Sequence, residues 1–233
     1  MKQSKPSSCE ERIALWVDRI RMVSGEMVWL KMEQARFKAL DEVFRFRSEL
    51  TKPESPFWSF QLWFTSYAIM SIRRQFDEDE NHVCIASLIA DILRHPTCIT
   101  RAHFASLSRG MGDAPPDWIE AKIAERSTGW LKDDGSLNVP AIRSEYKTLK
   151  DKANLFIRFA SSTIAHLNSK NLGDNFGLTF GDLDALILAL DSVVISYENM
   201  LTREGATRLP LHSDHPWVNA IAAPWWKDVG STE

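Results

Sequence analysis

Apolar residues recur every three or four positions along most of the chain, which is the spacing of one face of an α-helix. The pattern is clear from Ile13 to Phe44, and it predicts two helices or one bent helix over about residues 9–49. Ser8 and Glu11 have the spacing of a capping box at the start of this segment. Ser24 and the glycine after it can kink or break the segment.

The same spacing predicts further helices, separated by short loops rich in Pro, Gly or charged residues. They cover about residues 56–76, 85–93, 100–108, 117–127, 141–166 and 179–202. Alternation of apolar and polar residues is nowhere long enough to predict a sheet. We therefore expect an all-α protein with an up-and-down helical bundle.

The length of 233 residues suits one main domain with additions. We divide the chain into an N-terminal helical elaboration (residues 1–50), the bundle (51–209) and a Trp-rich C-terminal tail (210–233). The tail is expected either to pack back on the bundle or to form an interface patch. The most apolar run, Phe57 to Ile72, is interrupted by polar residues, so we interpret it as a buried core helix and not as a membrane span.

The charge and the cysteines narrow the function classes. A net charge of -3 and a pI of about 6.1 exclude a strongly basic footprint for nucleic acid, although a local basic patch remains open. The three cysteines are an odd number with no tight pairing, which suggests reduced thiols. Residues Met1 to Pro6 contain no apolar signal region. We therefore expect a soluble protein in the cytoplasm, not bound to a membrane.

The common catalytic motifs are missing from the sequence: the glycine-rich phosphate loop, the dinucleotide fingerprint and the nucleophile elbow. Their absence argues against common nucleotide-dependent enzymes and α/β-hydrolases. One group of metal-type ligands lies within 22 positions but lacks the paired spacing of known zinc sites. It comprises His82, Cys84, His95, Cys98 and His103. We expect no metal and no cofactor, and we keep a metal-dependent enzyme at this group as a minor alternative.

Two places carry side chains suited to acid–base or phosphate chemistry. Asp77 lies four residues after Arg73 and three after Arg74, so one helical face can hold them. They form either a surface salt bridge or a site arginine oriented by a carboxylate. His166 lies near the end of a predicted helix, with Arg158 before it. It is either a general acid or base near neutral pH or a structural residue at the helix end.

Three stretches bring these residues into a familiar order. They are residues 71–77 with 87–92, residues 156–168, and residues 214–226. Together they resemble the abortive-infection branch (Abi type U) of HEPN domains, the higher eukaryote and prokaryote nucleotide-binding helical domains. The resemblance covers about residues 58–226, whereas residues 1–50 match only as helix.

The resemblance implies an α-helical bundle that often dimerises. In active HEPN ribonucleases, an Arg and a His with four to six residues between them meet across the dimer interface and cut RNA without a metal. Carried over to this chain, His166 would be the acid or base, with Arg158, Arg73 or Arg74 as phosphate ligand. Asp77 would orient one of these arginines.

The chain departs from that motif because seven residues separate Arg158 from His166, about 12 Å along a straight helix. Phe159 follows Arg158, where active members often carry a polar side chain. Two functions stay open. One is a homodimeric, metal-independent ribonuclease of prokaryotic antiphage defence or toxin–antitoxin type. The other is a catalytically inactive HEPN-like module that binds a protein or nucleic-acid partner.

Overall fold

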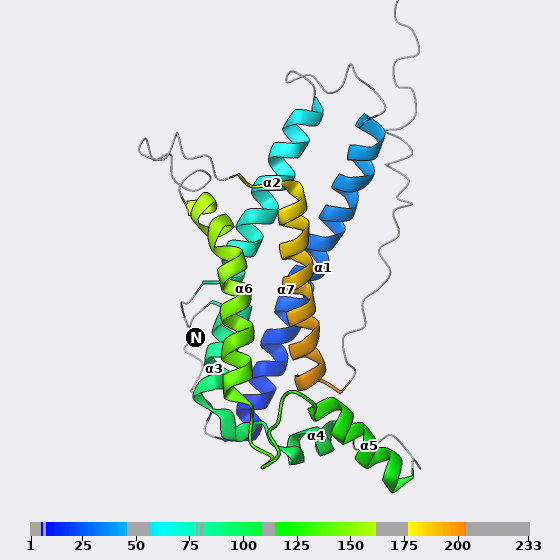
Figure 1. Cartoon of the computed structure of the whole chain (residues 1–233), viewed down its shortest axis with the longest axis vertical. Helices are drawn as coiled ribbons and strands as arrows, with labels where there is room; N and C mark the ends of the chain where they lie inside the picture. The colour runs from blue at the N-terminus through cyan, green and yellow to red at the C-terminus, as the bar shows by residue number, and fades with distance from the viewer. Residues whose placement is uncertain are drawn as a thin grey trace, which may run out of the picture. The chain divides into compact units, whose positions relative to one another are not determined.

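The architecture is all-α, as predicted. The computed structural model describes residues 6, 8–45, 56–77, 79, 82–108, 115–161 and 177–203. These residues form seven α-helices and one short 3₁₀ helix (Figure 1). Extended pairing in these ranges is limited to one isolated bridge, between Leu131 and Leu137. Among the same residues, no helix combines the length and the apolar character needed to cross a membrane.

The first helix, α1, is a single helix from Cys9 to Arg45. Its start is capped as expected, because the Ser8 hydroxyl accepts a hydrogen bond from the backbone N–H of Glu11 at 3.2 Å. The glycine at position 25 does not end it. Val23 and Met27 are buried on either side of that position. Tertiary packing on both sides therefore outweighs the weak helix propensity of one glycine.

The next helices begin and end close to the predicted positions. They are α2 (Pro56–Gln75), α3 (Ile85–Arg94), η2 (Pro96–Cys98), α4 (Arg101–Ser108) and α5 (Pro116–Ser127). Pro96 lies two residues beyond α3 and begins the 3₁₀ helix, since proline disfavours continuation of the α-helix before it. Thr100 caps α4 by accepting from the N–H of His103 at 3.4 Å.

The last two helices are long and carry side-chain caps. α6 (Val139–Phe159) begins after Asn138, whose side chain accepts from the N–H of Ala141 at 3.3 Å. α7 (Phe180–Leu201) begins with the predicted capping box of Thr179 and Asp182. Each side chain of this pair accepts from the other's backbone N–H, at 3.1 and 3.0 Å. The helix predicted up to residue 166 is described as far as residue 161.

The chain divides into two compact units, each described by itself. The first unit comprises residues 1–27 and 69–207, and the second comprises 28–68 and 208–233. α1 and α2 each contribute residues to both units. The boundaries between these compact units therefore differ from the domain boundaries expected from the sequence, at residues 50 and 210. The Trp-rich tail, residues 210–233, lies outside the described residues.

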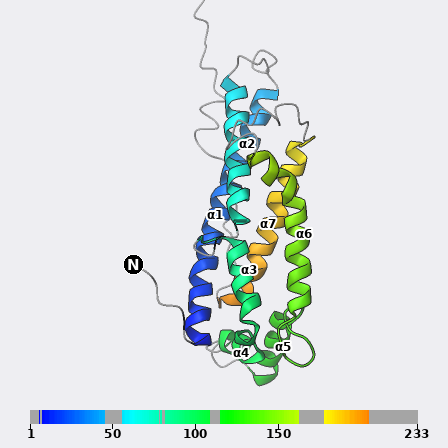
Figure 2. The same cartoon turned by 90° about the vertical axis from the view of Figure 1, so that its left-hand side faces the viewer.

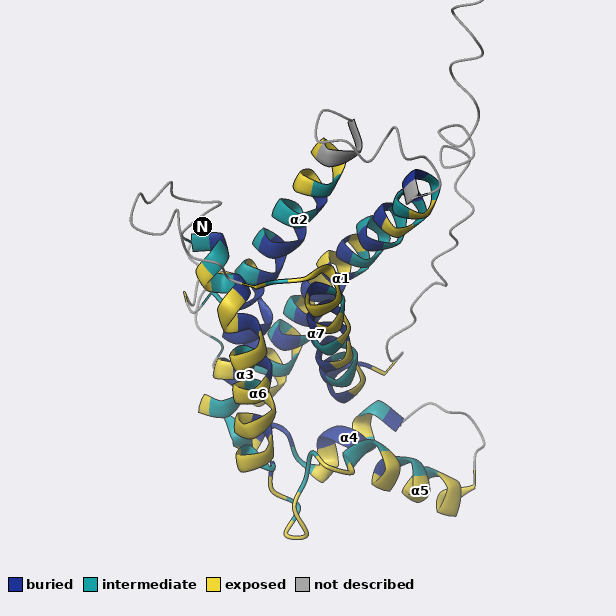
Figure 3. Cartoon of the chain, turned by 45° about the horizontal axis from the view of Figure 1, so that its top comes forward, coloured by how far each residue is buried: buried dark blue, intermediate teal, exposed yellow. Residues whose placement is uncertain are grey.

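In the first unit, α6 and α7 run side by side in opposite directions, and α3 contacts α6 (Figures 1 and 2). α4 packs against α5, which also contacts α7. The core of the unit includes large, fully buried side chains from several elements. These include Trp16, Ile20, Phe104 and Tyr197. Figure 3 shows that much of α5 and one side of α6 are exposed, although Ile123 of α5 is buried.

The described residues of the second unit belong to α1 and α2. Phe37 and Phe64 stack in parallel, with ring centroids 4.5 Å apart. A cavity of about 210 Å³ lies beside them, lined also by Leu40 and Trp63. Trp63 is 52% exposed and Trp29 is 58% exposed. This unit therefore places large aromatic side chains at its surface as well as inside.

Cys9 and Cys98 form a disulfide between the start of α1 and η2, with Cα atoms 5.0 Å apart. The prediction of three reduced thiols is wrong for these two residues. They are 89 positions apart, so only the tertiary fold brings them together. Cys84 is the free cysteine and is buried. Disulfides are rare in the reducing cytosol. The cysteines therefore no longer support a cytoplasmic location, which stays a prediction.

Cys98→Ser should lower the free energy of unfolding by about 2–4 kcal/mol, because the disulfide closes a long loop in the unfolded chain. Urea denaturation measures this difference. A reductant should destabilise the wild-type protein and leave the variant unchanged. Thiol titration of the unreduced wild type in denaturant should find the Cys84 thiol alone. Three titratable thiols before reduction would contradict the pairing.

Candidate functional site

Arg73 and Arg74 lie in the last turn of α2, and Asp77 follows two residues after the helix ends. The Asp77 carboxylate accepts hydrogen bonds from Nδ1 of His82, at 2.8 Å, and from the N–H of Asp79, at 3.0 Å. The Arg74 guanidinium donates to the Ser71 hydroxyl at 3.5 Å. Asp77 is therefore held by a histidine and a backbone N–H, whereas sequence reasoning had expected an arginine.

The environment of Asp77 keeps this carboxylate ionised. Its pKa is lowered first by the hydrogen bond from the Asp79 N–H and then by the one from His82. The charge of Arg73 lowers the same pKa as a smaller effect. Arg73 therefore influences Asp77 through the electrostatic effect of its charge.

Arg158 is exposed near the end of α6. The rings of Phe76 and Tyr146 stack with centroids 6.4 Å apart, which marks the level at which the end of α2 meets α6. Arg158 follows twelve residues after Tyr146, about 18 Å further along the helix. One chain therefore does not bring Arg158 to the corner of Arg73 and Asp77. His166 lies outside the described residues, as do residues 214–226.

The five residues considered as metal ligands have separate partners. These are Cys9 for Cys98, Asp77 for His82, Asp91 for His95 and the Met200 carbonyl for His103, while Cys84 caps α3. Within the described ranges, no three His, Cys, Asp or Glu side chains converge. The five residues therefore do not form a metal-ligand set in the described part of the chain.

His103 has a structural place in the first unit. It is buried, and its Nε2 donates to the Met200 carbonyl at 2.9 Å, which links α4 to the end of α7. Burial lowers its pKa, the hydrogen bond to Met200 raises it by less, and the nearby charge of Arg126 lowers it further. The neutral imidazole is therefore the form that fits this position.

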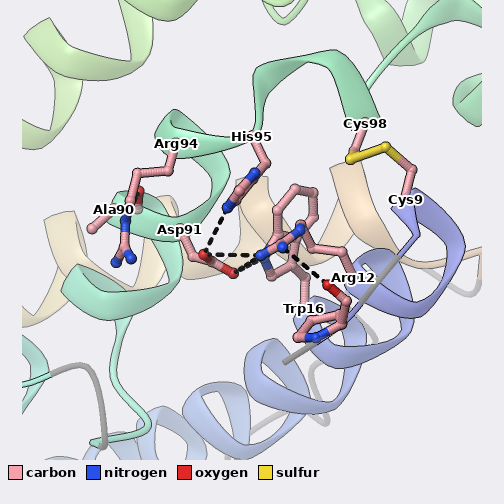
Figure 4. Close-up of polar contacts among 9 residues, drawn as sticks. Cys9, Arg12, Trp16, Ala90, Asp91, Arg94, His95 and Cys98 are labelled. Carbon is pink, nitrogen blue, oxygen red and sulfur yellow. Dashed lines mark hydrogen bonds and ion pairs between the residues drawn. A yellow bond between two sulfur atoms is a disulfide. The ribbon is translucent and has the colours of Figure 1, made fainter. Parts of the chain in front are cut away.

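A different group of polar side chains does converge, between α1 and α3 of the first unit (Figure 4). Asp91 on α3 is 8% exposed. One of its oxygens accepts from the indole N–H of Trp16 at 2.8 Å. The Arg12 guanidinium lies 3.3 and 3.4 Å from the two oxygens, and His95 Nε2 lies 3.8 Å from one of them. A charged hydrogen-bond network therefore joins the two helices.

Helical spacing places these groups on facing surfaces. Arg12 and Trp16 are one turn apart on α1, and His95, which follows the last residue of α3, lies one turn after Asp91. Burial of a carboxylate is unfavourable unless donors surround it. The indole and the guanidinium supply those donors, so the Asp91 charge is accommodated inside the unit.

Sequence reasoning did not select this group. The sequence does contain a signal for it, because the charged Asp91 lies one turn after Leu88 and directly before Ile92 in the apolar pattern of α3. A lone carboxylate among core positions indicates a buried partner. Its partners are 75 and 79 positions away, however, and no local pattern identifies them.

Comparisons with known proteins give no assignment for this arrangement. None of the family models, curated proteins or solved structures compared with the chain matches it. The function must therefore be argued from the chain's own residues and from the resemblance in its sequence.

Asp91→Ala should destabilise the protein by about 2–4 kcal/mol, because it leaves the Arg12 charge and the Trp16 N–H without their acceptor. His95→Ala is the matched control from the same network. Its side chain is 40% exposed and 3.8 Å from the carboxylate, so its loss should have a much smaller effect. Equal losses in urea denaturation would contradict the central place of Asp91.

His103 should make the protein less stable in mild acid. Its folded-state pKa is lowered, so the unfolded chain takes up the proton first as the pH falls. The neutral His103 contributes its full stabilisation above the unfolded-state pKa of about 6.5. This stabilisation is lost as the pH falls through the lower folded-state pKa. Urea midpoints at about pH 7.5 and about pH 5.5 test this, with His103→Gln as comparison. An equal acid-induced loss in both proteins would contradict the assignment.

Proposed function

We propose that this chain is a HEPN-like protein of prokaryotic antiphage defence or toxin–antitoxin type, which cuts RNA without a metal as a cytoplasmic homodimer. The sequence resemblance around Arg158 and His166 supports the proposal. The all-helical bundle is compatible with it. The structural observation that carries it is the exposure of Arg158 near the end of α6, where a phosphate can reach the guanidinium.

The proposed reaction uses the nucleophile that RNA itself contains. The 2′-oxygen attacks the adjacent phosphorus while the bond to the 5′-oxygen breaks. The products are a 2′,3′-cyclic phosphate and a 5′-hydroxyl. One proton leaves the 2′-hydroxyl and one reaches the 5′-oxygen, and His166 carries out one of these transfers. Arg158 stabilises the charge that develops on the phosphate oxygens.

A second copy of the chain has a chemical purpose in this proposal. Within one chain, Arg158 lies about 18 Å along α6 from the level at which α2 ends. In a homodimer, Arg73 or Arg74 of one copy would complete the phosphate site of the other. The proposed cleavage therefore requires the dimer as well as His166, Arg158 and one of the two arginines of α2.

A second candidate function is a catalytically inactive HEPN-like module that binds a nucleic acid or a protein. One observation favours it over cleavage. Asp77 is held by His82 and by a backbone N–H, and it is not hydrogen-bonded to Arg73 or Arg74 in the described part of the chain. Binding through exposed arginines needs no such orientation, whereas catalysis does.

Cleavage of a labelled RNA by purified protein in a metal chelator tests the proposal. His166→Ala should lower the rate about 100-fold or more, because it removes a proton-transfer group. Arg158→Gln should lower it by a similar factor through lost charge stabilisation. Arg143→Gln is the matched control, since Arg143 is also exposed on α6, four turns earlier, and should cleave like the wild type.

The outcomes separate the two candidates. Equal cleavage by wild type and His166→Ala would remove the ribonuclease proposal. RNA binding without cleavage, weakened by Arg158→Gln and unchanged by Arg143→Gln, would establish the binding module instead. The molar mass in solution, measured by light scattering, checks independently whether the protein is a dimer.

A further inference from the structure

The network around Asp91 forms one side of a pocket of about 300 Å³ in the first unit. Arg12, Arg19 and Arg94 line this pocket, together with His95. Asp91 is the one acidic residue in its described lining. Counted over the lining residues alone, three guanidinium groups and one carboxylate give a formal charge of +2. The protein as a whole is acidic, so this local excess of positive charge is distinct.

Asp91 does not neutralise the pocket as a whole. Its oxygens already accept from Trp16 and Arg12, and its side chain is 11% exposed. Arg19 is partly buried at the pocket and, among the described residues, has no hydrogen-bond or ion-pair partner. A guanidinium in a partly closed pocket without a carboxylate partner is a ready ligand for an anion.

The guanidinium groups, the charge and the volume of the pocket indicate which class of anion fits it. Guanidinium groups match the oxygens of a phosphate in paired, charge-assisted hydrogen bonds. A charge of +2 suits a dianion. The volume is at the lower end of small-molecule sites, which leaves room beside a phosphate for an attached organic group. Leu15 and Pro6 provide apolar lining for such a group.

We propose that this pocket binds a phosphate monoester, with Arg19 and Arg94 as its principal ligands and Arg12 held in place by Asp91. The disulfide between Cys9 and Cys98 ties the two walls together one turn from Arg12 and His95 (Figure 4). Preorganised walls reduce the entropy lost when an anion is bound. The pocket shares no residue with the proposed ribonuclease site, so the two proposals stand or fall separately.

Calorimetric titration of the full chain with inorganic phosphate and a nucleoside 5′-monophosphate tests the pocket. The third probe is a short RNA with a 5′-phosphate, compared with its 5′-hydroxyl twin. Arg19→Gln and Arg94→Gln should each lower the phosphate affinity about tenfold or more, because each removes charge-assisted hydrogen bonds. Arg143→Gln removes the same charge from exposed α6 and should bind like the wild type. Circular dichroism melting confirms that all three variants are folded.

The probes identify the source of the phosphate. Tighter binding of the monophosphate than of inorganic phosphate indicates a free nucleotide, and preference for the 5′-phosphorylated RNA over its twin indicates an RNA end. Phosphate affinity equal in wild type, Arg19→Gln and Arg94→Gln would overturn the proposal. Absence of binding by all three phosphate probes would overturn it as well.

Discussion

The carboxylate of Asp91 is the constraint on which the first unit depends. It is a charge in a nearly closed environment, and such a charge is tolerated only where donors replace the lost water. Those donors, Trp16 and Arg12, lie 75 and 79 positions before Asp91 in the sequence. The start of α1 must therefore pack against α3, and the Cys9–Cys98 disulfide holds the same two segments together beside this network.

The same constraint creates the chemistry of the pocket. Arg12 offsets the charge of Asp91, and Arg19 and Arg94 add two more guanidinium groups to the lining of the pocket. The residues of the proposed ribonuclease site lie elsewhere in the chain. Of these residues, Arg74 is exposed on α2 and Arg158 is exposed on α6. The proposed cleavage brings such arginines together only in a homodimer. The arginine-lined pocket and the exposed arginines of α2 and α6 are therefore separate features of the chain.

Much of the fold could be predicted because helices follow from local patterns. The capping pairs Ser8–Glu11 and Thr179–Asp182 and the stop at Pro96 act over three or four residues, and each lies where the sequence places it. The candidate site was harder. Arg158 and Asp77 were selected from spacing on single helices, which says nothing about whether two helices meet. Asp77 lies two residues beyond the end of α2 and contacts His82, five positions later.

By itself, the sequence determined the helices, their caps and the all-α class, because backbone hydrogen bonding and apolar periodicity are local. The tertiary structure alone decided which distant side chains meet: Cys9 with Cys98, Trp16 with Asp91, His103 with the Met200 carbonyl. These pairs are 75 to 97 positions apart. Burial makes such partners obligatory for a polar group, but only the packing of the helices determines which partner is within reach.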